Sequence, residues 1–290
     1  MQAYDKDKLE EAKKKIQHIA EIREREKRIR EKMKKIKYKI AIISGKGGVG
    51  KSTITSLLAL SLASRGYKVC VFDSDFHGPT IPKMLGVELE TVKISEDKEL
   101  IPPEGPYGIR VMSIHYFLPD PTTAVIWRGP LKRSFLEELL DKTNFGDTEI
   151  ILFDLPPGTG DEALNLAQVI PDLTGVIAVT QPTDVSAIAV AKALDFTRKL
   201  NIRVLGVIEN MSFFTPPGEG KMYRVFSGSG GKMLSEMFNV PLLGQIPIDP
   251  IISEFCDRGL GVLVADQKTK VIEIFNSITD KLLEILGEKH

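Results

Sequence analysis

The sequence predicts an α/β fold in which a mainly parallel sheet is flanked by helices and preceded by a long charged helix. Three observations support this fold class. The first 37 residues are dense in charge, and no Pro or Gly occurs from Asp5 to Lys37. The run Tyr38–Ser44 is short, apolar and stopped by glycine, as a buried parallel strand is. Apolar strand-length runs then alternate with helix-length segments through the rest of the chain.

The first segment, residues 1–37, is predicted to be one charged helix that faces solvent. It carries 14 Lys/Arg and 8 Asp/Glu, although the chain of 290 residues is neutral as a whole. Its apolar residues follow helical spacing but form a narrow stripe: Leu9, Ala12, Ile16, Ile19, Ile22, Ile29, Met33 and Ile36. We therefore expect residues 1–37 to be a helical extension that is separable from a catalytic domain at residues 38–290.

The domain is expected to alternate strands and helices. Ser52–Ser64 is predicted to be a helix that ends at Arg65-Gly66, and Lys68–Asp73 the next strand. Further strands are expected at Ile109–Ile114, Glu149–Asp154, Gly175–Thr180, Arg203–Glu209 and Pro241–Ile246. Further helices are expected at Leu131–Asp141, Asp161–Val169, Val185–Leu200, Lys232–Phe238, Ile251–Asp257 and Lys268–Leu286. Residues Glu88–Tyr107 are predicted to be a surface excursion between strands.

Composition excludes several classes of protein. The two cysteines, Cys70 and Cys256, are far apart in sequence, which excludes a disulfide framework and favours a reducing compartment. No apolar run approaches the roughly 18 residues of a membrane-spanning helix. The lysine clusters of the first helix are interleaved with glutamates and have no aromatic stacking partners, which argues against nucleic acid. We expect a cytoplasmic protein that binds neither membrane nor nucleic acid.

A glycine-rich loop after the first strand is the main functional signal. Its spacing, glycine, four residues, then Gly-Lys-Ser, lets backbone N–H groups face phosphate oxygens at a helix N-terminus. Lys51 is expected to bridge β- and γ-phosphate oxygens, and the Ser52 hydroxyl to coordinate Mg²⁺. A simple turn that opens a helix is the alternative, but the preceding strand and following helix favour the phosphate loop. The candidate nucleotide-binding residues here are Gly45, Gly47, Gly48, Val49, Gly50, Lys51, Ser52 and Thr53.

Acidic residues follow two of the predicted strands. Asp154 ends one of them and is expected to hold the water shell of Mg²⁺, and the Gly158 amide after Pro156-Pro157 is expected to reach the γ-phosphate. After the other strand, Asp73 is expected to approach Mg²⁺ and Asp75 to orient the attacking water. Helix capping for Asp154 and turn formation for the other two remain alternatives.

Lys46 is an additional cation that a simple phosphate loop does not need. It makes the loop resemble the deviant Walker A of the MinD, ParA, ArsA and nitrogenase iron-protein class of P-loop ATPases. Within that class the chain is most similar to the Mrp/ApbC iron–sulfur cluster carriers. The motifs that carry this resemblance are Asp73-Ser74-Asp75-Phe76-His77-Gly78-Pro79-Thr80, Trp127-Arg128-Gly129-Pro130, Asp154-Leu155-Pro156-Pro157-Gly158-Thr159-Gly160-Asp161, Glu209-Asn210-Met211-Ser212 and Gly244-Gln245-Ile246-Pro247-Ile248-Asp249.

The resemblance implies a homodimer closed around two ATP molecules. In that arrangement Lys46 reaches across to the partner's phosphates, as an arginine finger does elsewhere. It also implies that Asn210 and the loop from Pro247 to Asp249 contact adenine. Without the resemblance, a capping or turn role would serve equally well for Asn210.

One departure from the family concerns its metal cargo. The family's Cys-x-x-Cys ligands align with Pro216 and Glu219 in this chain, and neither supplies a thiolate for iron. Cys70 lies within an apolar strand, and Cys256 offers one thiol per subunit. The spacing of His18, His77, His115 and His290 does not suggest a metal site either. The residues therefore argue against an iron–sulfur cluster held by this chain alone.

These observations predict an enzyme that hydrolyses ATP to ADP and phosphate with Mg²⁺, using Lys46, Lys51 and Asp75. The resemblance implies a dimeric switch of the Mrp/ApbC type that acts on client apoproteins. The alternative is a MinD- or ParA-like positioning or adaptor ATPase without a metal cargo. The basic first helix and the final amphipathic helix favour this alternative. A kinase or ligase would require an acceptor pocket that the sequence does not reveal.

Overall fold

The computed structural model describes residues 2–76, 78–118, 129–158, 167, 169–216, 218, 220–259 and 270–288. Most of the helix predicted at Asp161–Val169 lies outside these ranges, as do Trp127, Arg128 and Glu219 of the sequence motifs. No helix within the described ranges is long and apolar enough to cross a membrane.

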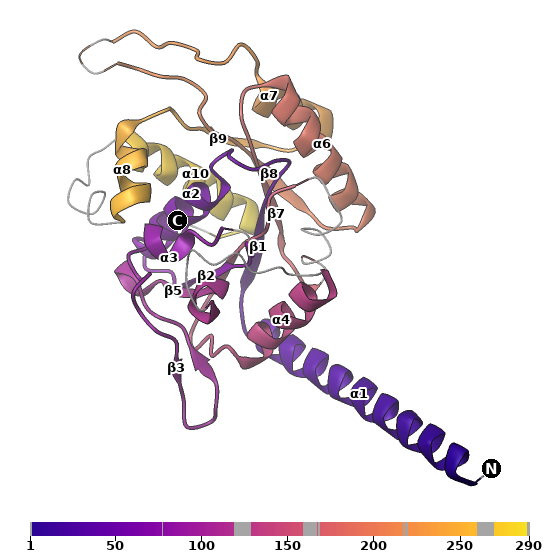
Figure 1. The fold of residues 1–290 in the computed structure, drawn as a ribbon. Coiled ribbons are helices and arrows are strands. Elements are labelled where there is room, and N and C mark those ends of the chain that lie inside the picture. Colours follow the sequence, from indigo (N-terminus) through magenta and orange to yellow (C-terminus); the bar gives the residue numbers. More distant parts are fainter. Residues whose placement is uncertain are drawn as a thin grey trace.

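A seven-stranded sheet with the order β5-β2-β6-β1-β7-β8-β9 forms the centre of the fold (Figure 1). Every neighbouring pair of strands is parallel, which confirms the predicted sheet. The strands are β1 (Tyr38–Ser44), β2 (Val69–Asp73), β5 (Arg110–Ser113), β6 (Ile150–Asp154), β7 (Gly175–Thr180), β8 (Val204–Glu209) and β9 (Leu242–Gln245).

Helices cover both faces of this sheet. Successive residues of each strand point to opposite sides, and because the strands are apolar throughout, both sides need a covering layer. Ile40 and Ile42 of β1 pack in one core, and Ala41 and Ile43 in the other. The first core lies under α2 (Lys51–Ala63), α3 (Ile81–Met84), α8 (Pro250–Arg258) and α10 (Lys270–Leu286). The second lies under α1 (Gln2–Lys34), α4 (Gly129–Lys142), α6 (Asp184–Lys199) and α7 (Gly230–Phe238).

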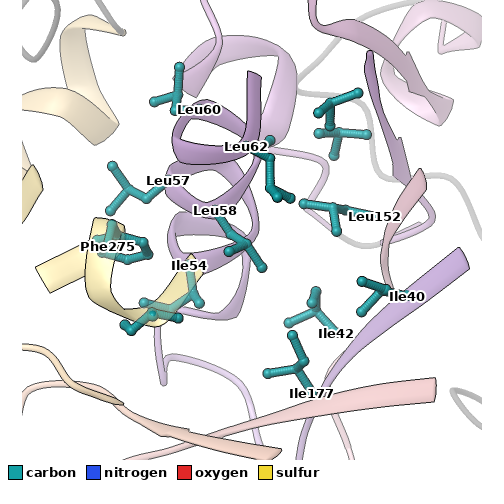
Figure 2. Packing of buried hydrophobic residues seen from close by; sticks show 14 of the residues in the cluster. Ile40, Ile42, Ile54, Leu57, Leu58, Leu60, Leu62, Leu152, Ile177 and Phe275 are labelled. Atoms are coloured by element: carbon teal, nitrogen blue, oxygen red, sulfur yellow. The ribbon is translucent and has the colours of Figure 1, made fainter. Parts of the chain in front are cut away.

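Figure 2 shows how α2 seals the first core. Leu58 and Leu62 point toward Ile40 and Ile42 of β1 and Leu152 of β6. This apolar contact holds α2 against the central strands of the sheet. The excursion predicted at Glu88–Tyr107 is present and contains a small antiparallel hairpin, β3 (Lys93–Ile94) with β4 (Leu100–Ile101).

The C-terminal end of α1 packs on the domain, contrary to the prediction that this helix faces solvent. Ile29, Met33 and Ile36 are buried in the second core, at no more than 3% exposure. Arg28 donates two hydrogen bonds to Asp141 of α4, at 2.8 and 2.7 Å, and Lys32 Nζ lies 2.6 Å from Glu99 Oε1. The prediction that residues 1–37 face solvent along their whole length is therefore wrong for this end. Ile29 and Met33 share one side of the helix, and Ile36 follows just past its end, so this narrow apolar stripe still suffices for a core contact.

Candidate nucleotide-binding site

The glycine-rich loop leaves the carboxyl end of β1 and leads directly into α2. β1 lies between β6 and β7. Strands β6, β2 and β5 extend the sheet on one side of it, and β7, β8 and β9 extend it on the other. In parallel α/β sheets, ligands bind at the carboxyl edge where the order of strands switches in this way. The fold therefore places the predicted residues from Gly45 to Thr53 at the edge where a ligand is expected.

Two glycines of this loop are required by close neighbours. A β-carbon at Gly45 would stand 2.4 Å from the backbone of Ala189 in α6. Gly50 has a φ of +85°, and a β-carbon there would stand 2.3 Å from Asn210 Nδ2. Any larger residue at either place would push the loop away from α6 or from Asn210, so the loop's path depends on both glycines.

Three side chains of α2 converge on the carboxylate of Asp154 at the end of β6. Lys51 Nζ and Ser52 Oγ each lie 2.6 Å from its Oδ2, and Thr55 Oγ1 lies 2.6 Å from its Oδ1. Lys51 and Asp154 are buried. The predicted phosphate lysine and two of the three predicted magnesium ligands, Ser52 and Asp154, are thus brought together. Asp154 is not a helix cap, because its carboxylate accepts these three bonds instead.

Asp73 lies beside Asp154 in the register of β2 and β6. Burial, together with the neighbouring charge of Asp154, raises the pKa of the Asp73 carboxyl to about 8, while Lys51 opposes that shift. Ser113 Oγ donates to Asp73 Oδ2 at 3.0 Å, and the N–H of Asp75 donates to Asp73 Oδ1 at 3.2 Å. Crowding of two carboxylates around one lysine is the electrostatic condition that a divalent cation relieves.

Gly158 and Lys46, the other residues predicted to contact phosphate, do not take part in this cluster around Asp154. The N–H of Gly158 donates to Ser44 O at 3.1 Å, so that amide is already engaged by the backbone. Lys46 is half-buried, and its side chain has no hydrogen bond or ion pair with another described residue. Exposed apolar residues of α6, Val185 (72%) and Ile188 (56%), lie close to the loop, since Gly45 packs on the next residue, Ala189.

The base side of the predicted site is formed by two loops. Asn210 Nδ2 donates to Val49 O at 2.8 Å, which ties the end of β8 to the phosphate loop. Asp249 caps α8, because its Oδ1 accepts from the N–H of Ile251 at 2.9 Å. The N–H of Ile248 donates to Phe213 O at 2.7 Å, so the loop from Pro247 to Asp249 is joined to the segment after Asn210. The predicted adenine residues thus belong to one connected loop pair.

Three supporting residues were not predicted to act at the site. Thr55 and Ser113 orient Asp154 and Asp73, and Glu209 accepts from the N–H of Gly231 and from Gln245 Nε2, both at 2.7 Å. A threonine within a helix and a serine at a strand end carry no local signal. Ser113 could be found only through the register that sets it opposite Asp73.

The cysteines do not form a metal site within the described part of the chain. Cys70 is fully buried in β2, and burial raises the pKa of its thiol to about 12. Cys256 Sγ lies 3.3 Å from Thr53 Oγ1, beside the phosphate loop. The described residues contain no group of three or more His, Cys, Asp or Glu that could hold a metal ion. Pro216 occupies one of the two positions where ligand cysteines were sought.

Comparisons with known proteins extend over most of the chain. Residues 35–283 match the ParA family, described as NUBPL iron-transfer P-loop NTPase. An iron-sulfur cluster carrier protein of Saccharolobus solfataricus is 45% identical over 249 residues, which cover 86% of this chain and 84% of that protein. A nucleotide-binding protein of Archaeoglobus fulgidus, solved in complex with ADP, is 34% identical with a TM-score of 0.74, covering 86% of this chain and 96% of that one.

A solved structure of the septum site-determining protein MinD from Pyrococcus horikoshii, with Mg-ADP, shares the fold. Its TM-score is 0.60 at 22% identity, and the similarity covers 86% of this chain and 96% of that one.

Proposed function

The chain belongs to the NUBPL iron-transfer family of P-loop NTPases, and from this membership we propose that it is a Mg²⁺-dependent ATPase that works as a nucleotide-operated switch in iron–sulfur cluster transfer. The observation that carries the proposal is the convergence of Lys51, Ser52 and Thr55 on Asp154 at the end of the phosphate loop. It joins the two halves of a nucleotide site, the loop and the acidic strand end.

The ion pair between Lys51 and Asp154 supports a specific sequence of events. Without nucleotide, the lysine charge is satisfied by the carboxylate at 2.6 Å. The phosphates of ATP draw the ammonium group away, which leaves Ser52 as the remaining donor to Asp154 Oδ2, while Thr55 keeps the other oxygen in place. Ser52, Asp154 and Asp73 are the residues that would hold Mg²⁺. When bound, Mg²⁺ neutralises charge on the β- and γ-phosphate oxygens.

Hydrolysis requires a water molecule held in line with the γ-phosphate. Asp75 is the proposed orienting residue, since its backbone is fixed by the bond to Asp73 and it follows the same strand end. Lys46 is the proposed donor to the γ-phosphate of a second copy of the chain. The side chain of Lys46 has no hydrogen bond or ion pair with another described residue, which leaves its ammonium group available for this role.

A homodimer is the proposed active form. Val185 and Ile188 are exposed beside the loop that carries Lys46, and exposed apolar side chains next to an incomplete site suit a partner subunit. Binding two ATP molecules between two such surfaces would bury these side chains and bring each Lys46 to the opposite nucleotide. We further propose that this homodimer acts in the cytoplasm on client apoproteins.

The cargo step is the part where this chain departs from the Cys-x-x-Cys pattern that the resemblance implies. The donors present do not fit a cluster held by the chain alone, because the two thiols of one subunit lie on separate elements and Cys70 is fully buried. We therefore assign no cluster-binding step to this chain's own cysteines. Cluster transfer by this chain would require thiolates from a client or from another carrier.

Phosphate release and nucleotide binding by the purified protein test the enzymatic proposal. We expect phosphate release from ATP with Mg²⁺ and none with EDTA, and nucleotide binding that is lost in Lys51→Ala. Lys35→Ala, at an exposed position just after α1, is the matched control. A parent protein that binds ATP no more tightly than Lys51→Ala would remove the assignment, and faster hydrolysis of GTP than of ATP would correct its nucleotide.

A further inference from the structure

α1 has two separate faces, and only one of them packs on the domain. Ile29 and Met33 bury one side of the helix, and Ile36, just past its end, packs in the same core. With 3.6 residues per turn, Ile16 and Ile19 lie roughly 100° around the axis from that side. They are 67% and 50% exposed. A longer contact of the same face with the domain would therefore not cover these two isoleucines.

The exposed face continues as a row of cations. Arg23, Lys27, Arg30 and Lys34 follow Ile16 and Ile19 at spacings of four, three and four residues, which keeps them on one side of the helix. All four are exposed, and none forms an ion pair or hydrogen bond with another described residue. Two acidic residues, Glu26 and Glu31, flank this row of cations at its edges. By contrast, Arg28 and Lys32, which face the domain, are paired with Asp141 and Glu99.

The position of α1 leaves this face accessible. In Figure 1 the N-terminal half of α1 projects beyond α4 and away from the sheet. It is also the basic segment of a protein whose remaining residues, from 38 onward, hold six more Asp/Glu than Lys/Arg. An acidic partner is therefore repelled by the domain and attracted to the helix.

We propose that this basic face, made of Ile16, Ile19, Arg23, Lys27, Arg30 and Lys34, docks an acidic amphipathic helix of another protein. The two isoleucines offer an apolar seam, and the four cations pair with acidic residues that flank the partner's seam. A second copy of this chain is a poor occupant. Pairing two basic faces would oppose like charges in a parallel arrangement and set cations against isoleucines in an antiparallel one.

Nucleic acid and anionic lipid match the basic face as a whole less well than an acidic amphipathic helix does. Phosphates have no apolar surface for Ile16 and Ile19, and a helix that lies on lipid needs an apolar face along most of its length. The proposal does not depend on ATP hydrolysis, because the basic face contacts neither the nucleotide site nor the core.

Binding of synthetic peptides to the full-length protein tests the proposal. The probe is a fluorescent amphipathic helical peptide with a leucine seam flanked by glutamates, and its counterpart has lysines instead. We expect the acidic peptide alone to bind, and Lys27→Glu/Arg30→Glu to weaken it on the order of tenfold. The control Lys35→Glu/Lys93→Glu makes the same change of charge at exposed positions outside the basic face and should stay within about twofold.

A second pair of variants tests the apolar seam. Ile16→Ser/Ile19→Ser should weaken the acidic peptide by about fivefold, whereas the control Leu89→Ser, at a 93% exposed leucine, should not. Thermal unfolding and phosphate release establish that each variant is folded. Equal binding of the two peptides, equal loss in the charge control or an unchanged Ile16→Ser/Ile19→Ser would overturn the proposal. So would tighter binding of duplex DNA or of phosphatidylserine vesicles with the same dependence on Lys27 and Arg30.

Discussion

Thr55 Oγ1 lies 2.6 Å from Asp154 Oδ1, on the side of the carboxylate opposite Lys51 and Ser52. Thr55→Val removes this donor without changing the shape of the side chain, and it leaves a buried acceptor short of a partner at a cost of about 1–3 kcal/mol. We expect the variant to need several-fold more Mg²⁺ for half-maximal hydrolysis, while Thr55→Ser behaves as the parent. A magnesium titration of phosphate release measures this. An unchanged titration in Thr55→Val would show that Asp154 needs no support from Thr55.

The two loop lysines should separate binding from turnover. Lys46→Ala removes a donor that acts only on the partner's nucleotide, so ATP affinity should stay within roughly one order of magnitude while turnover falls about 10²–10³-fold. Lys51→Ala should weaken binding itself, because its own subunit's phosphates lose their cation. Calorimetric titration with ATP and a phosphate-release assay give the two quantities. Undiminished turnover in Lys46→Ala would remove the trans-lysine role.

Asp75→Asn should bind Mg-ATP and accumulate as a stable dimer. The change keeps the size of the side chain and removes the charge proposed to orient water, so hydrolysis stops after assembly. Size-exclusion chromatography with ATP and with ADP measures the dimer, and phosphate release measures the reaction. If the variant hydrolyses ATP at the parent rate, the orienting role belongs to another residue.

The buried end of α1 should contribute to stability, and its projecting end should not. Met33→Ala empties a fully buried position and is expected to cost about 2–5 kcal/mol. Ile19→Ala, at an exposed position of the same helix, should change the free energy of unfolding by less than about 0.5 kcal/mol. Deletion of residues 2–22 should leave a folded ATPase, whereas deletion of residues 1–36, which also removes Ile29 and Met33, should lower the unfolding temperature. Urea denaturation and thermal unfolding of the four proteins decide between these outcomes.

Metal reconstitution tests the disagreement between the family and this chain's ligands. After anaerobic incubation with iron and sulfide, we expect the homodimer to bind less than one stable cluster, since a thiolate-held cluster needs about four cysteines. Cys256→Ser should keep its ATPase activity, because a serine hydroxyl can preserve the contact with Thr53. Iron and sulfide quantitation with absorption spectra measures the first result. A stoichiometric cluster that is lost in Cys256→Ser would instead make Cys256 a ligand.

Much of the fold could be predicted because buried parallel strands have a simple signature. Tyr38–Ser44 and Gly175–Thr180 were predicted with the bounds that the structure has, since both are continuous apolar runs with clear stops. Lys51, Ser52 and Asp154 could be expected to meet, because a phosphate loop and an acidic strand end share one edge of the sheet.

Residues that depend on pairing between distant segments could not be found in this way. Thr55 became visible only when α2 lay against β6, and Ser113 only when β5 paired with β2. The contact of α1 was missed for the same reason. The apolar stripe of α1 correctly predicted an amphipathic helix. How wide a stripe must be to pack on a domain depends on how closely α4 and the sheet approach the helix, which the sequence does not show.

The ties of α1 also constrain the order in which the chain folds. Arg28 is separated from Asp141 by 113 residues, and Lys32 from Glu99 by 67. During synthesis α1 leaves the ribosome well before α4 exists, so Ile29 and Met33 remain uncovered until more than 100 further residues have been added. The docking of α1 on the domain therefore waits for α4, and the nascent chain leaves this apolar end without its α4 contact while the intervening residues are added.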